Sequence, residues 1–316
     1  FCGFSRTGSE EPNSRVCPTC IGHPGSKPVL NKKAVEFALK LALATKSEIA
    51  PSLVFSRKSY FYPDMSKNYQ ITQYEMPLAE EGVVMLENGK AVGLTRIHLE
   101  EDPASLVHPA GMQESSYVLV DYNRSGNPLV EMVTHPVLES AGEARNFMKQ
   151  LITILEYLEI FDVNSCIIKA DANVSIKESG YSRVEVKNIT GFKEIERALL
   201  YEIARQQKEV SEGRKIEQET RAWDAEKGIS SLLRKKETEE EYGYIIDPDL
   251  VPISLSASWI KELKEKMPEL AHEKVSKFKT QHGISEEMAA IISKDKALAE
   301  MYEAVSVSVN PSLAAK

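Results

Sequence analysis

Residues 96–103, Arg-Ile-His-Leu-Glu-Glu-Asp-Pro, first alternate polar and apolar side chains and then carry three consecutive acids before Pro103. Successive side chains point to opposite faces of a β-strand, so Ile97, Leu99 and Glu101 share one face. Glu101 therefore ends an apolar row, where a carboxylate must be hydrogen-bonded, paired or bound to a cation. The alternative is a strand that runs out into a solvated acidic turn. The opposite face is polar and carries Arg96, His98 and Glu100.

A second acid is set into an apolar strand row at residues 129–133. In that predicted strand Glu131 shares its face with Leu129 and Val133. The recurrence of this placement favours a functional role for Glu101 and Glu131 over a chance surface position.

Residues 167–188 predict a β-hairpin with one apolar face and one polar face, joined by a turn at 178–182. The polar face mixes acids, which hold a hard cation through oxygen, with bases, which neutralise phosphates. Either a solvated sheet surface or a magnesium–nucleotide site has this composition. The polar residues are Lys169, Asp171, Asn173, Ser175, Lys177, Arg183, Glu185 and Lys187.

Three cysteines and a histidine lie near the start of the chain, at Cys2, Cys17, Cys20 and His23. Two thiolates separated by two residues, as in Cys17-Pro-Thr-Cys20, can reach one tetrahedral zinc ion. A structural zinc site takes four ligands, and His23 is the candidate for the fourth. The alternative is that the cysteines are small buried thiols in a loop-rich segment.

Arg57 and Lys58 stand just before an aromatic run that includes Tyr60. Adjacent cations beside aromatic rings can grip phosphates and stack a base. An amphipathic surface strand has the same composition, so both interpretations stay open.

The chain has 316 residues, enough for about two domains and a substantial core. Its formal charge of −8 argues against nucleic-acid binding by general electrostatics but leaves room for a local basic site. Four cysteines indicate a reducing compartment rather than a disulfide scaffold. No apolar run reaches the ~20 residues of a membrane span, and no signal peptide is visible. We therefore expect a cytoplasmic protein, with a truncated start before Phe1.

Helical periodicity and capping residues predict three longer helices and a helical end to the chain. The longer helices are expected at 32–46 with an Asn31 cap, at 140–158 with a capping box at Ser140 and Glu143, and at 190–212 with a Thr190 cap. Short helices are expected at about 259–266, 271–281, 286–293 and 296–304. With the alternating strands, this pattern predicts an α+β fold with antiparallel sheet.

Ordered motifs over nearly the whole chain resemble the B subunits of the tRNA-dependent amidotransferases, the aspartyl/glutamyl-tRNA(Asn/Gln) amidotransferase family. The resemblance is specific, because many matching segments recur in the same order. The segments are residues 12–14 with Cys17 and Cys20, then 28–35, 57–64, 69–73, 98–102, 121–126, 128–131, 171–175, 185–188, 219–221 and 248–252.

The resemblance implies a cradle domain with an antiparallel sheet related to the glutamine synthetase fold. It places this kinase-like domain at residues 1–280, with an N-terminal zinc-binding loop in some family members. Residues 281–316 are expected to begin an all-α domain.

The resemblance also implies an ATP- and Mg2+-dependent ligase of protein biosynthesis. Such subunits phosphorylate the side-chain carboxylate of Glu or Asp misacylated on tRNA(Gln) or tRNA(Asn), and ammonia then displaces the phosphate. A partner amidase (glutaminase) subunit supplies the ammonia through an internal channel, and a small third subunit clamps the heterotrimer.

By motif position, the resemblance assigns roles to particular residues. The expected magnesium ligands are Glu101, Glu131 and Glu185. The expected catalytic residues are Lys58 and Asp171, as proton relays at the channel mouth, and Glu185. The expected contacts to ATP or the acylated RNA end are Arg57, Tyr60, Asn173, Lys187 and Asn188.

Two other functions fit parts of the sequence. One is a non-catalytic scaffold that docks an amidase and tRNA. The other is a glutamine-synthetase-like ligase acting on a small free carboxylate, which the set Glu101, Glu131 and Glu185 alone would permit.

Overall fold

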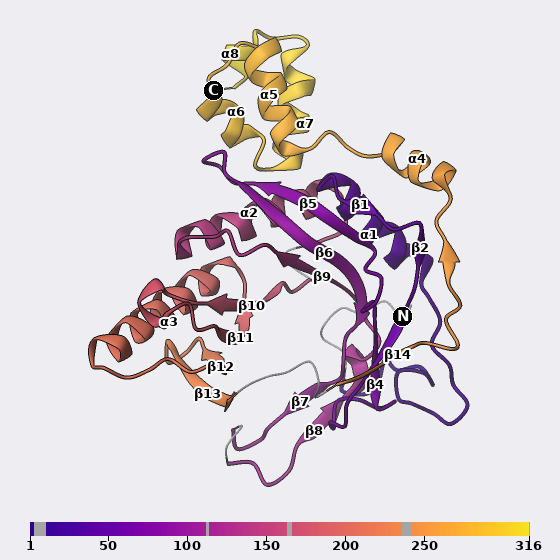
Figure 1. The fold of residues 1–316 in the computed structure, drawn as a ribbon. Helices are drawn as coiled ribbons and strands as arrows, with labels where there is room; N and C mark the ends of the chain where they lie inside the picture. Colours follow the sequence, from indigo (N-terminus) through magenta and orange to yellow (C-terminus); the bar gives the residue numbers. More distant parts are fainter. Residues whose placement is uncertain (3–10, 112–113, 163–165, 236–241, 316) are drawn as a thin grey trace.

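The computed structural model describes residues 1–2, 11–111, 114–162, 166–235 and 242–315. Over these residues the chain is a mixed α+β protein whose strand pairs are antiparallel with one exception. The predicted fold class is confirmed at this level. Figure 1 shows the sheets in the body of the molecule and the last helices gathered at one end.

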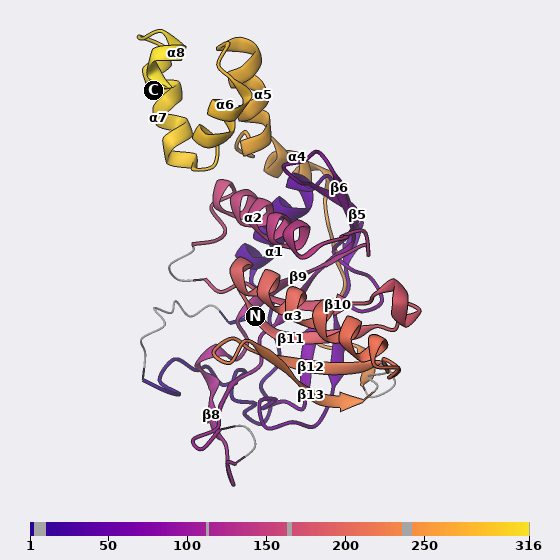
Figure 2. The same cartoon turned by 90° about the vertical axis from the view of Figure 1, so that its left-hand side faces the viewer.

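The first sheet carries the acidic strand at its centre, in the order β1-β5-β6-β9. Helices α1 and α2 cover one face of this sheet (Figures 1 and 2). On that side Ile97 and Leu99 are fully buried, as the alternation predicts. The elements are α1 (Lys32–Ala44), β1 (Glu48–Ile49), β5 (Ala79–Met85), β6 (Ala91–Glu101), β9 (Pro128–Thr134) and α2 (Ala141–Tyr157).

Both helices begin where their capping residues predict. The Asn31 side chain accepts a hydrogen bond from the N–H of Lys33 at α1. The Ser140 hydroxyl accepts one from the N–H of Glu143 at α2, at 3.1 Å. Each bond satisfies a backbone donor that has no partner within the helix.

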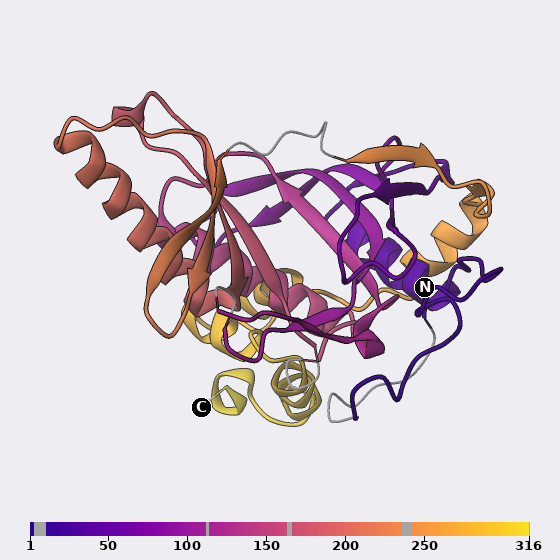
Figure 3. The same ribbon diagram turned by 90° about the horizontal axis from the view of Figure 1, so that it is seen from below.

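The second sheet has the order β10-β11-β12-β13 and packs against α3. Figure 3 shows α3 at the outer edge of the molecule, with this sheet between it and the first sheet. The predicted hairpin is confirmed as the β10–β11 pair. The predicted Thr190 cap is wrong, because Thr190 ends β11 and Gly191 is the N-cap of α3, with φ +82°. The elements are β10 (Lys169–Val174), β11 (Val184–Thr190), α3 (Phe192–Ser211), β12 (Glu219–Asp224) and β13 (Ile229–Lys235).

A third sheet, β14-β3-β4, lies against the acidic end of β6. The fully buried side chain of Gln73, just after β4, links this region to β6. Its Oε1 accepts a hydrogen bond from the N–H of Leu99 at 2.9 Å, and its Nε2 donates one to the backbone carbonyl of Val54. The elements are β3 (Ser56–Ser59), β4 (Tyr69–Thr72) and β14 (Gly243–Ile246). Two short strand pairs are β2 (Ser52–Leu53) with β15 (Ile253–Ser254) and β7 (Ser105–Val107) with β8 (Leu119–Asp121). Two 3-10 turns are η1 (Tyr122–Arg124), after β8, and η2 (Lys177–Ser179), between β10 and β11 of the second sheet.

The chain ends in short helices close to the predicted positions. Helices α5 to α8 share a small hydrophobic cluster of their own around Phe278 and Tyr302. Phe278 lies on α5, so that helix belongs to this cluster, and the division at residue 280 stays a prediction. In the described part of the chain, no helix has the length and apolar character to cross a membrane. The elements are α4 (Ala257–Glu265), α5 (Ala271–Gln281), α6 (Glu286–Ile292), α7 (Lys296–Ser306) and α8 (Pro311–Ala314).

Acid is expected to loosen these helices through Glu303 of α7. Burial alone would raise the pKa of Glu303, but hydrogen bonds from Lys274 and Lys277 of α5 lower it below the ordinary 4.5. A carboxyl group whose pKa is lower in the folded than in the unfolded protein stabilises the fold at a pH above its unfolded-state pKa. This stabilisation is lost as the pH falls through its folded-state pKa. Protection factors for hydrogen exchange in α5 and α7 should therefore fall as the pH drops below 4.5.

The matched variant Glu303→Gln should show reduced protection already at neutral pH and little further loss of this kind in acid. Equal protection of α5 in the wild type above and below that pH would contradict the role given to Glu303.

Candidate metal-binding and active site

The centre of the candidate site is a cross-strand pair between β6 and β9 of the first sheet. Glu131 of β9 lies directly opposite His98 of β6, and residues in such a pair share a face. Glu100 follows two positions after His98 and points to the same side. His98 Nε2 is 3.4 Å from Glu131 Oε2 and 3.9 Å from Glu100 Oε2. One ligand atom from each of the three lies within 4.8 Å of the other two.

Positive charges surround this cluster. The imidazole of His98 lowers the pKa of Glu131, and the charges of Lys58 and Arg96 add to the effect. Burial alone would lower the pKa of His98, but hydrogen bonding to Glu100 and Glu131 raises it. The surroundings of Glu131 therefore favour its ionised form.

The donor set fits a divalent cation. Carboxylate oxygens are the ligands that Mg2+ and Mn2+ prefer, and imidazole is a common partner ligand for Mn2+ and other transition metals. His98 is 7% exposed, and its Nδ1 is buried without a hydrogen-bond partner in the described part of the chain. Glu131 is half exposed, so the cluster is open to solvent on the Glu131 side. A divalent ion held here would take the place of the hydrogen bonds between His98 Nε2 and the two carboxylates.

The structure places Glu101 elsewhere, which corrects the predicted ligand set. Glu101 is buried on the opposite face of β6, where its carboxylate is 2.8 Å from the Lys67 ammonium and accepts the N–H of Ile71 at 3.0 Å. Among the described residues, no group of possible metal ligands joins Glu101 with Glu131 or with Glu185. The alternation along β6 is the reason, because it turns Glu101 toward the core and Glu100 toward Glu131.

A second polar site lies on the second sheet. The Lys187 ammonium is 3.3 Å from the Asp171 carboxylate and 3.2 Å from the Glu185 carboxylate. Burial alone would lower the pKa of Lys187, but the two carboxylates raise it. The Thr220 hydroxyl of β12 donates to Glu185 at 3.3 Å. Asn173 stands opposite Glu185 in the β10–β11 register. The predicted residues of this face are thus brought together, but around a lysine.

Asn188 lies at an irregularity of this hairpin. The register shifts between Ala170 and Ala172, so that one residue of β10 faces two of β11. Asn188 takes the left-handed conformation there, with φ +67°. Such a bulge redirects the neighbouring side chain, here Lys187, toward Asp171.

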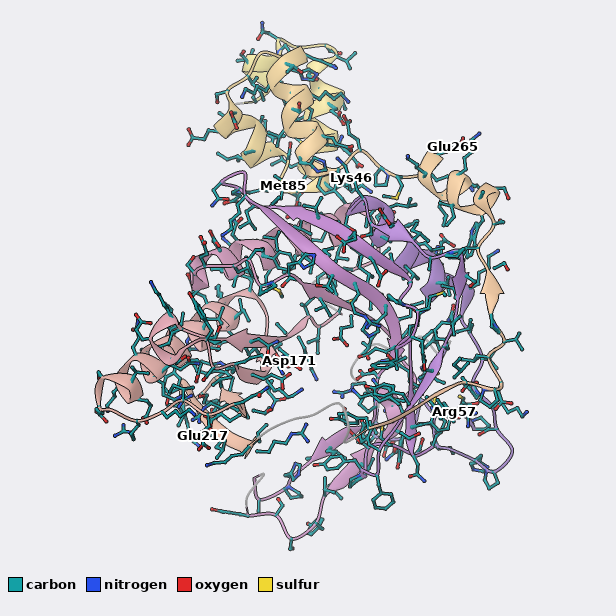
Figure 4. All side chains as sticks on the ribbon, viewed as in Figure 1. Lys46, Arg57, Met85, Asp171, Glu217 and Glu265 are labelled. Carbon is teal, nitrogen blue, oxygen red and sulfur yellow. The ribbon has the colours of Figure 1, made fainter. Side chains whose placement is uncertain are left out.

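The two polar sites lie on neighbouring parts of the molecule. Figure 4 shows Asp171 on the side of its sheet that is turned toward β6 and β9. Lys169 of β10 has its pKa lowered by burial and by the charge of Arg124, while Asp102 at the end of β6 acts in the opposite direction. The start of β10 therefore lies near the acidic end of β6.

Lys58 and Arg57 point to opposite faces of β3. The charge of Lys58 contributes to the lowered pKa of Glu131. Arg57 is engaged on the other face: its guanidinium donates to Asp247 at 2.7 Å and to Asp249 at 2.8 Å (Figure 4 labels Arg57). Arg57 therefore braces the segment after β14, and the predicted phosphate contact does not lie on the side of the cluster.

Tyr60 stays on the Lys58 side. Burial raises its pKa, and the charge of Glu100 is among the further causes. Tyr60 meets Tyr242 edge to face, with ring centroids 5.6 Å apart.

The three cysteines meet, but the predicted histidine does not join them. The sulfur atoms of Cys2, Cys17 and Cys20 lie within 4.8 Å of one another, and Cys17 and Cys20 are 3.3 Å apart. His23 is absent from every possible ligand group of the described residues, and it borders a separate hollow with Arg57. The turn after Cys20 carries His23 away, which corrects its assignment as the fourth ligand.

The cysteine loop supports the end of β6. Cys2 donates its N–H to the carbonyl of Gly126 at 2.6 Å, and Ser125 donates to the carbonyl of Cys20 at 3.0 Å. Gly126 donates in turn to the carbonyl of Asp102. A side chain at Gly126, whose φ is +76°, would also press on the sulfur of Cys20. The loop thus fixes the turn that precedes β9 and its Glu131.

Sequence reasoning passed over His98 and Glu100 as ligands. The signal was present, because an imidazole and a carboxylate two positions apart share the polar face of a strand. What was missing was the register that sets Glu131 against His98.

Comparison with known proteins shows the family of the chain. Residues 1–261 match the family described as the GatB/GatE catalytic domain. Proteins named as the B subunits of aspartyl/glutamyl-tRNA(Asn/Gln) amidotransferases are similar to the chain. The one from Methanosarcina mazei is 46% identical over 100% of this chain and 64% of its own length. Those from Saccharolobus solfataricus and Thermodesulfovibrio yellowstonii are 47% and 45% identical, each over 96% of this chain and 65% of their own lengths.

The chain spans just under two thirds of the length of these curated relatives. The family match covers far more than half of the chain, however, and it includes both polar sites and the cysteine loop. The chain therefore belongs to the GatB/GatE catalytic domain family.

Proposed function

We propose that this chain carries the transamidation site of a glutamine-dependent tRNA amidotransferase. In this proposal it uses ATP and Mg2+ to activate the side-chain carboxylate of Glu-tRNA(Gln), Asp-tRNA(Asn) or both, and then amidates it. The observation that supports this most is the cluster of His98, Glu100 and Glu131 beside Lys58, in a chain of this family.

The charges on this face suit the reaction. Phosphorylating a carboxylate brings two anions together, so positive charge must offset their repulsion. His98, Glu100 and Glu131 would hold the Mg2+, which supplies Lewis-acid stabilisation of phosphoryl oxygens when bound. Lys58 and Arg96 stand where they can bind the anionic groups of the substrates. Lys187 adds a cation on the second sheet, held in place by Asp171 and Glu185.

The remaining parts of the proposal follow the family pattern. The antiparallel sheets would form the glutamine-synthetase-like cradle. Lys58 and Asp171 would lie at the mouth of the ammonia channel and relay protons. The ammonia would come from a partner amidase subunit, and a small clamp subunit and the misacylated tRNA would complete the assembly.

The direct test is conversion of Glu-tRNA(Gln) and Asp-tRNA(Asn) by the full-length protein assembled with its amidase and clamp partners. Conversion should require ATP, Mg2+ and either glutamine or ammonia. Turnover of free glutamate without tRNA would instead show a small-carboxylate ligase. An assembly that binds tRNA but consumes no ATP would show a scaffold.

We also propose that Cys2, Cys17 and Cys20 hold a structural zinc ion together with one further donor. Their sulfur atoms are close enough to share an ion, and the N–H of Cys20 donates to the sulfur of Cys17 at 3.4 Å. Zinc would fix the loop that supports the end of β6.

Cys20→Ser is expected to reduce the zinc content from about one ion per chain to nearly none and to lower the melting temperature. Elemental analysis of the purified protein measures the first effect, and thermal unfolding measures the second. The exposed Cys166 provides the control, since Cys166→Ser should change neither. A wild-type protein without zinc would contradict this proposal.

A further inference from the structure

Tyrosines line the face of the third sheet that carries Lys58. Tyr74 and Tyr244 are stacked, with ring centroids 4.0 Å apart and planes inclined by 18°. Tyr60 and Tyr242 meet edge to face at 5.6 Å. The Lys58 ammonium lies 4.4 Å from the centre of the Tyr242 ring.

The stacked pair lies beside Arg96, which precedes the cluster of His98, Glu100 and Glu131 along β6 and β9. Tyr244 of β14 lies directly opposite Lys58 of β3, so the two side chains share one face of the third sheet. Arg96 donates to the backbone carbonyl of Tyr74 at 3.2 Å, and it lies two positions before His98 on the same face of β6. The pair therefore forms part of the rim of the site.

This rim is open to solvent. Tyr74 is 38% exposed, and Tyr244 is half-buried against it. The stacked rings cover each other's inner faces, so a further ring can stack only on an outer face of the pair, beside Lys58 and Arg96. Unpaired nucleotides bind surfaces of this kind, because every base can stack on a ring while cations attract the phosphates.

We propose that Tyr74 and Tyr244 stack an unpaired base at the acylated end of the RNA substrate. This inference rests on the proposed function and adds a binding site to it. An amino acid esterified to the terminal ribose keeps its carboxylate close to the terminal bases. When that carboxylate reaches the metal-binding cluster, those bases must lie at its rim, where the tyrosines are.

The test is steady-state amidation by the full-length complex, together with direct binding of the misacylated tRNA. Tyr74→Ala and Tyr244→Ala should each raise the KM for tRNA by about 5- to 100-fold, the range expected for loss of one base stack. The KM for ATP should stay within about twofold of wild type. Tyr74→Phe and Tyr244→Phe keep the ring and should bind tRNA nearly as well as wild type.

The exposed Tyr181, on the turn before β11, provides the control, because Tyr181→Ala should leave both constants unchanged. An unchanged KM for tRNA in both alanine variants would overturn the proposal, and so would a rise in the KM for ATP alone. Amidation by the wild-type complex separates failure of this proposal from failure of the proposed function. If the proposed function is wrong, the wild-type complex does not amidate tRNA at all. Unaltered melting temperatures would show that the variants are folded.

Discussion

Replacing Glu131 by glutamine is expected to slow amidation of misacylated tRNA by about 100-fold or more. Glu131 supplies one of two carboxylates next to His98, and a neutral amide both weakens ion binding and removes charge from the cluster. The rate of conversion at saturating ATP and tRNA measures the effect. Raising the Mg2+ concentration should recover part of the lost rate, because the remaining ligands still bind the ion more weakly.

The control for this variant is Glu139→Gln, since the Glu139 side chain is 83% exposed on the surface. That change should leave the rate within about twofold of wild type, as expected for a surface substitution. If Glu131→Gln also amidates tRNA at the wild-type rate, then Glu131 does not bind the catalytic ion.

Lys67→Met is expected to have the largest effect on stability. The Lys67 and Glu101 side chains are 8% and 6% exposed, and they form a 2.8 Å ion pair between the loop before β4 and the end of β6. Removing the cation leaves a carboxylate buried without its charged partner, which costs about 3–5 kcal/mol in comparable cases. Denaturant unfolding with both spectroscopic and calorimetric detection measures this loss of free energy.

The double variant Lys67→Met/Glu101→Gln tests whether the unpaired Glu101 carboxylate causes the loss of stability. Because it removes both charges, it should recover much of the lost stability. A single Lys67→Met variant that unfolds within about 0.5 kcal/mol of wild type would show that the pair is solvated.

Local features of the fold could be predicted from the sequence because their causes are local. Asn31 and Ser140 cap α1 and α2 through neighbouring N–H groups, so their helices start where the residues indicate. The hairpin β10–β11 shows its alternation and its turn within one short segment. Thr190 was misassigned because the chain continues as strand until Gly191 turns it.

The site depended on contacts between distant segments. The alternation along β6 correctly put Glu101 on the apolar face, but the same alternation turns it away from Glu131. The β6–β9 register sets His98 opposite Glu131, although the two residues are 33 positions apart. No pattern within either strand indicates this register. The same holds for Lys67, which neutralises Glu101 from the loop before β4.

The cysteines show the same division between local and distant causes. Cys17 and Cys20 are close because a tight turn brings them together, and their spacing predicts it. Cys2 reaches them because its backbone binds Gly126, far along the chain. His23 follows Cys20 in sequence but is not in the ligand group, and the turn that holds it is formed by local hydrogen bonds such as His23 N–H to the carbonyl of Pro18.

The most direct test of the metal-binding cluster is anomalous diffraction from crystals of the protein grown with Mn2+, which substitutes for Mg2+. We predict a peak in contact with His98, Glu100 and Glu131, and its loss in crystals of Glu131→Gln. A Mn2+ peak on the opposite face of β6, bound by Glu101 without Glu131, would contradict this assignment.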